Sequence, residues 1–341
     1  MKVLLLLNGL EGCQTGIEDG FNYILKSGKI SKLDWFYFED FAKKTSRYDS
    51  KLKMMNLAKD LEPNLIIFFH ISKFPIDNLF LAELRKINSK PILVYDEGDM
   101  YGSWAKPISK QMAVIIKSVD VVSIRGLGKF YDKIVKLNKN IIYTPHHNDI
   151  NRFDSQNIKN ENREFDLVLV GNRIKPRFLS FIRRLPGAKG RENFVRNIGS
   201  VFQKQFKLFG NGWDKFQCTQ GPVDFYKQNE IYKNAKITLA YEHYPEIPYY
   251  FSNRLPMALM NGSIYVCHYH KGYENMFPNC DFIFFFKTNS EAIDIINYLL
   301  SLSNEELLLR SKNAREFSSR QYHPNVIWMN FFNNIIKYAK F

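Results

Sequence analysis

The chain has 341 residues, more than the roughly 250 to 300 at which one hydrophobic core stops growing, so we expect two domains. Its apolar runs are far shorter than the roughly 18 residues that a membrane-spanning helix needs, so we expect no transmembrane helix. The four cysteines are scattered, without a CxxC pair or zinc-type spacing, and predict a reduced, cytoplasmic protein.

The formal net charge of +14 favours contact with anions. Ten Lys and Arg residues lie between Arg173 and Lys207, where the single acid is Glu192. This region is either a solvated face or a surface for phosphates or for an anionic membrane, which would make the protein peripheral to that membrane. Nucleic acid is not an expected partner, because the sequence has no helix-turn-helix, zinc-finger or RNP-like signature.

The first half alternates short apolar runs with amphipathic segments, which predicts a parallel, doubly wound α/β sheet. The expected strands are residues 3–8, 33–38, 65–70, 92–95, 121–124 and 141–144. The expected helices are residues 17–25, 50–61, 78–87, 108–117 and 129–135.

Residues 148–163 are polar and predict a linker, after which the strand pattern restarts. Further strands are expected at residues 165–171, 207–210, 237–241, 264–267 and 282–286, and two helices from residue 304 to the end. The predicted domains are therefore residues 1–150, an acceptor-side domain, and 164–320, a nucleotide-sugar-binding domain. Residues 321–341 form a last helix that we expect to pack back on the first domain.

The segment from Tyr249 to Cys267 is the most informative part of the chain. Ser252 or Asn253 is placed to cap a short helix that Gly262 ends before a buried strand. Free backbone N–H groups at that helix start, with Arg254 beside them, suit a diphosphate. An ordinary capped helix is the competing interpretation.

Two other turns follow predicted strands. In Gly171-Asn172-Arg173, the backbone of Gly171 can approach a phosphate, and Arg173, Lys175 or Arg177 can pair with its charge. The Gly210-Asn211-Gly212 turn permits close approach of a ligand. This pattern favours neutralising a diphosphate by arginines and backbone rather than by a metal on carboxylates.

These motifs occur together in an order that resembles one family, the CgeB-like (spore maturation protein type) group 1 glycosyltransferases. The shared segments are Asp166–Gly171 with Arg177, Leu208–Trp213, Gly221–Val223, Tyr232–Ile237, Ser252–Arg254 with Gly262, Lys271–Phe277 and His323. Fainter matches in the first half are Glu62–Ile67, Val94–Asp96, Asp120–Val122 and Tyr143–Pro145.

The resemblance implies a GT-B fold, with two facing Rossmann-like doubly wound domains and a cleft between them. It also implies metal-independent transfer of a sugar from a nucleotide-diphosphate sugar, with no further cofactor, to a saccharide, glycoprotein or lipid-linked acceptor. Tyr249, beside the Ser-Asn-Arg motif, is then a further candidate for donor binding.

One position departs from the family. Where an acidic residue usually follows the motif arginine by three positions, this chain has Met257, which cannot accept a hydrogen bond from sugar hydroxyls as a carboxylate does. We expect Glu274 to replace it, with Glu242 and Glu246 as alternatives.

Catalytic groups for the acceptor are expected at strand ends of the first domain. Asp96, with Glu97 and Asp99, offers a general base or an orienting carboxylate, and His70 offers a proton acceptor, as do the paired histidines 146 and 147. A retaining reaction needs no base here, so the stereochemistry stays open.

Two other functions fit the same residues. A catalytically silent nucleotide-sugar-binding or scaffold module would bind the nucleotide without transfer. A sugar-nucleotide epimerase of the same architecture would release a free epimer without any acceptor.

Overall fold

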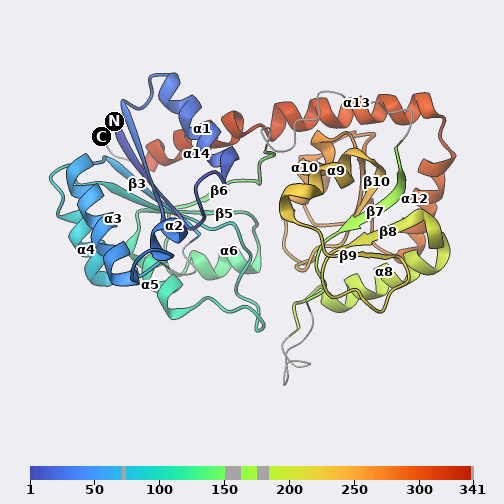
Figure 1. The fold of residues 1–341 in the computed structure, drawn as a ribbon, viewed down its shortest axis with the longest axis horizontal. Coiled ribbons are helices and arrows are strands. Elements are labelled where there is room, and N and C mark those ends of the chain that lie inside the picture. Colours follow the sequence, from blue (N-terminus) through green and yellow to red (C-terminus); the bar gives the residue numbers. More distant parts are fainter. Residues whose placement is uncertain (71–73, 150–162, 175–183, 339–341) are drawn as a thin grey trace. The chain divides into compact units, whose positions relative to one another are not determined.

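The computed structural model describes residues 1–70, 74–149, 163–174 and 184–338. The chain forms two compact units (Figure 1). Unit 1 comprises Met1–Gly102, Lys106–Pro145 and Pro324–Phe341, and unit 2 comprises Ser103–Ala105 and His146–His323.

Unit 1 is built on a six-stranded parallel sheet with strand order β2-β1-β3-β4-β5-β6. The order reverses direction between β1 and β3, and ligands of such sheets bind beyond the carboxyl ends of the strands at that point. The strands are β1 (Lys2–Leu7), β2 (Lys32–Tyr37), β3 (Leu65–Phe69), β4 (Ile92–Asp96), β5 (Val121–Ile124) and β6 (Ile141–Tyr143).

The helices of unit 1 include one from the far end of the chain. They are α1 (Thr15–Lys26), α2 (Phe38–Ala42), α3 (Arg47–Leu61), α4 (Asn78–Arg85), α5 (Lys110–Ser118), α6 (Lys129–Ile134) and α14 (Pro324–Tyr338).

The last helix, α14, lies beside α1 on one face of this sheet (Figure 1). A Cβ at Gly20 would lie 2.2 Å from Cδ1 of Trp328, so the glycine lets the two helices approach closely. Trp328 packs against Phe21 and Phe69, with ring centroids 5.7 and 5.4 Å apart. The core of unit 1 therefore joins residues near opposite ends of the sequence.

Unit 2 repeats the plan, with strand order β12-β11-β10-β7-β8-β9. The direction reverses between β7 and β10, which pair in parallel. The strands are β7 (Phe165–Val170), β8 (Phe206–Phe209), β9 (Thr219–Gly221), β10 (Ala235–Ala240), β11 (Ile264–His268) and β12 (Ile283–Phe286).

Helices cover both faces of the second sheet. One face packs against α8 (Ala188–Phe202) and α12 (Asn289–Ser301), through a core that includes Phe194, Ile198 and Ile296. The remaining helices are α9 (Gln228–Lys233), α10 (Arg254–Met260), α11 (Tyr273–Met276) and α13 (Asn304–Gln321). Helix α10 is buried all round from Leu255 to Met260 and packs against α13.

The two-sheet α/β fold predicted from the strand pattern is confirmed. The pattern missed β9 and α2, and it started α3 three residues late, because Ser46 and Asp49 form a capping box before the apolar residues begin.

Polar residues are buried at the two described ends of the predicted linker, whose role as a linker stays a prediction. Asn148 is fully buried and donates to the carbonyl oxygen of Ser318 at 3.0 Å. Arg163 donates to the carbonyl oxygens of Ala235 and Asn261. Polar side chains can be buried when backbone carbonyls satisfy them, and composition does not reveal this. The middle of the linker lies outside the described residues.

Candidate functional site

Two glycines meet where β7 and β8 of unit 2 end. Gly171 donates its N–H to the carbonyl oxygen of Phe209 at 2.8 Å, and a Cβ at Gly210 would lie 2.5 Å from the oxygen of Gly171. The indole Nε1 of Trp213 donates to the same oxygen at 2.7 Å. Only glycines fit this close approach of two strand ends.

The following residues link the two turns. The N–H of Arg173 donates to the carbonyl oxygen of Asn211 at 2.8 Å, and the N–H of Asn211 donates to Oδ1 of Asn172 at 2.8 Å. The guanidinium of Arg173 pairs with Glu192 of α8 at 2.8 Å. Asn172, Arg173, Gly210 and Asn211 were all predicted as donor-binding residues, and the structure brings them together with Gly171.

Two buried arginines lie against Gly171. A Cβ there would lie 2.1 Å from Nη2 of Arg191 and 2.5 Å from Nη1 of Arg254. Arg254 Nη2 pairs with Glu242 at 2.5 Å, and Ser252 Oγ donates to the other oxygen of Glu242 at 2.7 Å. One carboxylate therefore pairs with Arg254 and acts electrostatically on Arg191, and the cluster keeps one positive charge.

The pKa values follow from this crowding. Burial and Arg254 lower the pKa of Arg191 to about 9, which leaves it charged at neutral pH. Burial alone would raise the pKa of Glu242, but Arg254, Ser252 and Arg191 outweigh it and lower that pKa to about 2. Although burial opposes it, Glu242 holds the pKa of Arg254 above its usual range.

His243 completes the cluster as a neutral acceptor. Burial, Arg191 and Arg254 lower its pKa to about 3, so the ring is uncharged at neutral pH. Nη1 of Arg191 and Nε2 of His243 lie 2.9 Å apart, so the guanidinium donates to the ring. The Nε atom of Arg191 is buried and has no hydrogen-bond partner among the described residues.

A small pocket with a volume of about 20 Å³ opens beside this cluster. Its lining is Arg173, Ile174, Arg184, Ala188, Arg191, Glu192, Trp213 and His243. Three of these residues are arginines and one is an acid. Four follow the carboxyl ends of β7, β8 and β10, and the other four lie in or just before α8. The pocket therefore adjoins the point where the strand order of unit 2 reverses, and its charge suits an anion.

The helix start predicted to be capped is different in the structure. Asn253 occupies the N-cap position of α10 without a side-chain cap, and Ser252 is engaged by Glu242 and Arg254. The cap prediction is therefore wrong, because a buried carboxylate competes for the serine hydroxyl. Arg254 also points to Glu242 and does not line the pocket, whereas Arg191 does.

Glu274 lies in α11 and Tyr249 in the loop between β10 and α10, and both contact the loop that connects β11 to α11. Glu274 is exposed and accepts hydrogen bonds from Tyr269 Oη at 2.9 Å and from the N–H of Gly272 at 3.1 Å. The Tyr249 ring lies over Gly272, and Asn275 donates to its hydroxyl at 3.1 Å. The role of Glu274 as a replacement for the missing acid remains a prediction. Arg177 lies outside the described residues.

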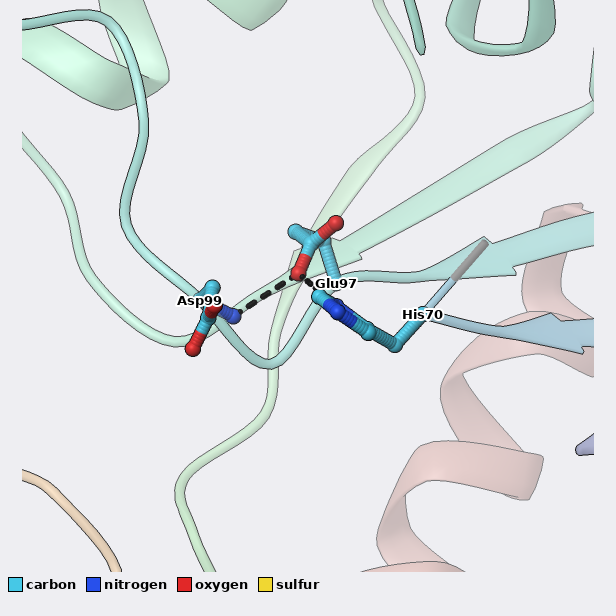
Figure 2. A group of neighbouring side chains, drawn as sticks. All are labelled: His70, Glu97 and Asp99. Atoms are coloured by element: carbon cyan, nitrogen blue, oxygen red, sulfur yellow. Dashed lines mark hydrogen bonds and ion pairs between the residues drawn. The ribbon is translucent and has the colours of Figure 1, made fainter. Parts of the chain in front are cut away.

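In unit 1, His70 and Glu97 meet at the ends of β3 and β4 (Figure 2). Nδ1 of His70 lies 2.7 Å from Oε1 of Glu97, which also accepts the N–H of Asp99 at 2.8 Å. The hydroxyl of Tyr95 donates to the other oxygen of Glu97. Because a carboxylate only accepts, Nδ1 carries the hydrogen and Nε2 holds the free lone pair.

This arrangement suits His70 to accept a proton. The hydrogen bond to Glu97 raises the pKa of His70, although partial burial opposes the shift. The side chain of His70 keeps 32% of its exposure, while Glu97 is buried. His70 adopts φ of 45°, an uncommon value for a non-glycine residue. Its backbone N–H donates to the backbone carbonyl oxygen of Asp96 at 3.0 Å.

Asp96, the other predicted acid, is buried and fully engaged. Arg125 donates to both of its oxygens, at 2.8 and 2.6 Å, and Ser123 Oγ donates at 2.6 Å. These contacts favour a structural role, because Arg125 and Ser123 already engage both oxygens of the carboxylate. Its catalytic role stays a prediction, and Glu97 is the neighbouring acid that reaches a histidine.

One group of potential metal ligands among the described residues lies close enough to share a cation. It consists of His70, Glu97 and Asp99, whose ligand atoms lie within 4.8 Å of one another. Existing contacts compete with that use. Glu97 already binds His70, and Lys106 Nζ pairs with the Asp99 carboxylate at 2.6 Å.

Residues 177–333 match the model of the family described as glycosyl transferase-like. No curated protein matches the sequence.

The whole chain is similar in fold to known glycosyltransferase structures. A sucrose-phosphate synthase from Thermosynechococcus elongatus is 11% identical, with a TM-score of 0.62, and the match covers 99% of this chain and 98% of that one. HepE from Anabaena in complex with UDP is 14% identical, with a TM-score of 0.60 and coverage of 99% and 100%. A glycosyltransferase from Rickettsia africae is 11% identical, with a TM-score of 0.62 and coverage of 99% and 98%. The chain has the GT-B fold.

Three members of the arginine cluster were not among the predicted site residues. Arg191 had a detectable signal, because it shares the helical face of Phe194, Val195 and Ile198, where a charge is unusual. Glu242 was only an alternative, and His243 had no distinguishing pattern.

In the described part of the chain, no helix is both long and apolar enough to cross a bilayer.

Proposed function

We propose that this protein transfers a sugar from a nucleotide-diphosphate sugar to a hydroxyl of a saccharide, glycoprotein or lipid-linked acceptor. The observation that carries the proposal is the buried cluster of Arg191, Arg254 and Glu242 against Gly171, in a half that matches the glycosyl transferase-like model. Its one excess positive charge lies beside an arginine-lined pocket at the carboxyl ends of the strands.

Sugar transfer requires stabilising the charge that develops on the leaving diphosphate as the glycosidic bond breaks. We assign this task to Arg191 and Arg173, which both line the pocket, together with the backbone around Gly171. Arg254, which pairs with Glu242, lies against Gly171 beside Arg191. Guanidinium groups suit this role because they stay charged and donate several hydrogen bonds in one plane.

A uridine nucleotide is the donor we favour. HepE was solved with UDP and with UDP-glucose, and an Escherichia coli protein of the same fold with UDP-2-fluoro glucose. The subgroup most similar in its motifs is the CgeB-like one, and Glu274 is our candidate for contacts with donor hydroxyls. Thermal-shift titration with UDP, GDP, CDP and dTDP sugars tests the nucleotide.

On the acceptor side we assign the role of general base to Nε2 of His70. Glu97 orients the ring of this histidine. Transfer of the proton from an acceptor hydroxyl to this nitrogen would accompany attack on the sugar in an inverting reaction. The imidazolium that forms is stabilised by the buried carboxylate, which already receives the Nδ1 hydrogen.

We further propose that no metal takes part, because arginines supply the positive charge for the diphosphate. EDTA should then leave transfer unchanged. A strict requirement for manganese would contradict this and would direct attention to His70, Glu97 and Asp99.

The central experiment compares Arg191→Met with Arg196→Met. Arg196 lies on the same helix but is exposed, so it controls for loss of one charge. The first variant should lower kcat/KM for the donor by about 10²-fold, as expected for an interaction worth about 3 kcal/mol in the transition state. Equal activity of the two variants, with both folded, would remove the cluster from the mechanism. Nucleotide binding by the wild type without any transfer would favour the silent module instead.

A further inference from the structure

The start of α3 in unit 1 exposes large apolar side chains. Tyr48 is 75% exposed and Leu52 is 51% exposed. They lie four residues apart and are therefore neighbours on one face of the helix. The opposite face, with Met54 and Leu61, is buried in the unit, so the helix has a second, unburied apolar stripe.

Basic residues surround this stripe. They are Lys43, Lys44, Arg47, Lys51 and Lys53, and all but the partly buried Lys51 are exposed. The one acid between residues 43 and 57 is Asp49, whose carboxylate accepts from the backbone N–H and the hydroxyl of Ser46. The stripe and these bases together are called the α3 surface below.

A third apolar side chain lies next to the α3 surface. Lys51 Nζ pairs with Asp77 at 2.6 Å, and Asp77 caps the start of α4. Leu79, in the first turn of that helix, is 76% exposed. The ion pair therefore holds the exposed leucine of α4 close to the start of α3.

We propose that the α3 surface docks on an anionic lipid bilayer. The bases are attracted to the negative headgroups, and the tyrosine and leucines enter the boundary between headgroups and acyl chains, where such side chains are favoured. A soluble polyanion would use the bases but gain nothing from three exposed apolar side chains. This inference does not depend on the proposed sugar transfer.

The basic region from Arg173 to Lys207 is a weaker candidate for the same contact. Within its described part, the exposed large apolar residues are Ile174 and Val201, near opposite ends of the segment. It therefore lacks a contiguous apolar stripe among its charges.

Co-sedimentation of the full chain with phosphatidylcholine vesicles that contain about 30% phosphatidylglycerol tests the proposal. Three double variants are compared: Tyr48→Ser/Leu52→Ser, Arg47→Gln/Lys53→Gln, and the control Lys110→Gln/Lys117→Gln. The control removes the same charge from exposed positions of α5 in the same unit. Far-UV circular dichroism checks that each variant is folded.

The first two variants should each bind the vesicles about tenfold or more weakly, and the control less than about twofold more weakly. Salt should separate the two effects, because it screens the bases but not the apolar insertion. Absence of wild-type binding, or equal losses in the control, would overturn the proposal. Undiminished binding by the serine variant would also overturn it, because the surface would then be a site for a polyanion or an acidic protein.

Discussion

Replacing Glu242 by glutamine tests whether the buried arginine cluster has the charge balance derived above. The side chain is 5% exposed, pairs with Arg254 at 2.5 Å and accepts from Ser252 at 2.7 Å. Glutamine keeps the shape but removes the carboxylate that pairs with Arg254 and acts on Arg191, and leaving a buried charge without its partner costs about 3 to 5 kcal/mol.

The pH dependence gives the same magnitude independently. A pKa lowered from 4.5 to about 2 corresponds to about 3 kcal/mol of stability. Because the folded-state pKa is the lower one, this stability is fully present above pH 4.5 and is lost as the pH falls toward 2. The glutamine variant should lack that part of the acid sensitivity.

Urea unfolding, followed by circular dichroism and by the fluorescence of the buried Trp213, measures both effects in unit 2. The matched control is Glu246→Gln, an exposed carboxylate four residues away, which should change stability by less than about 0.5 kcal/mol. The Glu242→Gln/Arg254→Met double variant should lose less stability than the sum of the losses in the two single variants. Each single variant leaves one partner of the ion pair alone, whereas the double variant removes both. Equal stability of the two glutamine variants would refute the reasoning.

Three further predictions concern other parts of the two units. Gly171→Ala should weaken UDP binding at least tenfold in calorimetry, because its Cβ would strike the two buried guanidinium groups; wild-type affinity would argue against that crowding. Glu97→Gln removes the cause of the raised pKa of His70, so the acidic limb of the kcat/KM profile should move to lower pH; an unmoved limb would exclude this histidine as the base. Asp96→Asn should destabilise unit 1 by about 3 kcal/mol, because Arg125 loses its buried partner, and an unchanged Tm would contradict that.

The sequence by itself determined the elements and their class. Short runs such as Leu65–Phe69 are apolar throughout because parallel strands are covered on both faces, so the pattern predicts buried strands and intervening helices. Glycines at strand ends, such as Gly171 and Gly210, marked the turns that matter, because only a residue without Cβ fits there. These are local properties, which neighbouring residues carry.

Only the tertiary structure decided which strand ends lie together and which charges are already paired. The sequence placed His70 and Asp96 at separate strand ends, but strand order and side-chain direction joined His70 to Glu97 and gave Asp96 to Arg125. The same applies to Arg254, whose charge is engaged by Glu242. Burial and ion pairing depend on contacts between distant segments, and such contacts leave little trace in the local pattern that sequence reasoning uses.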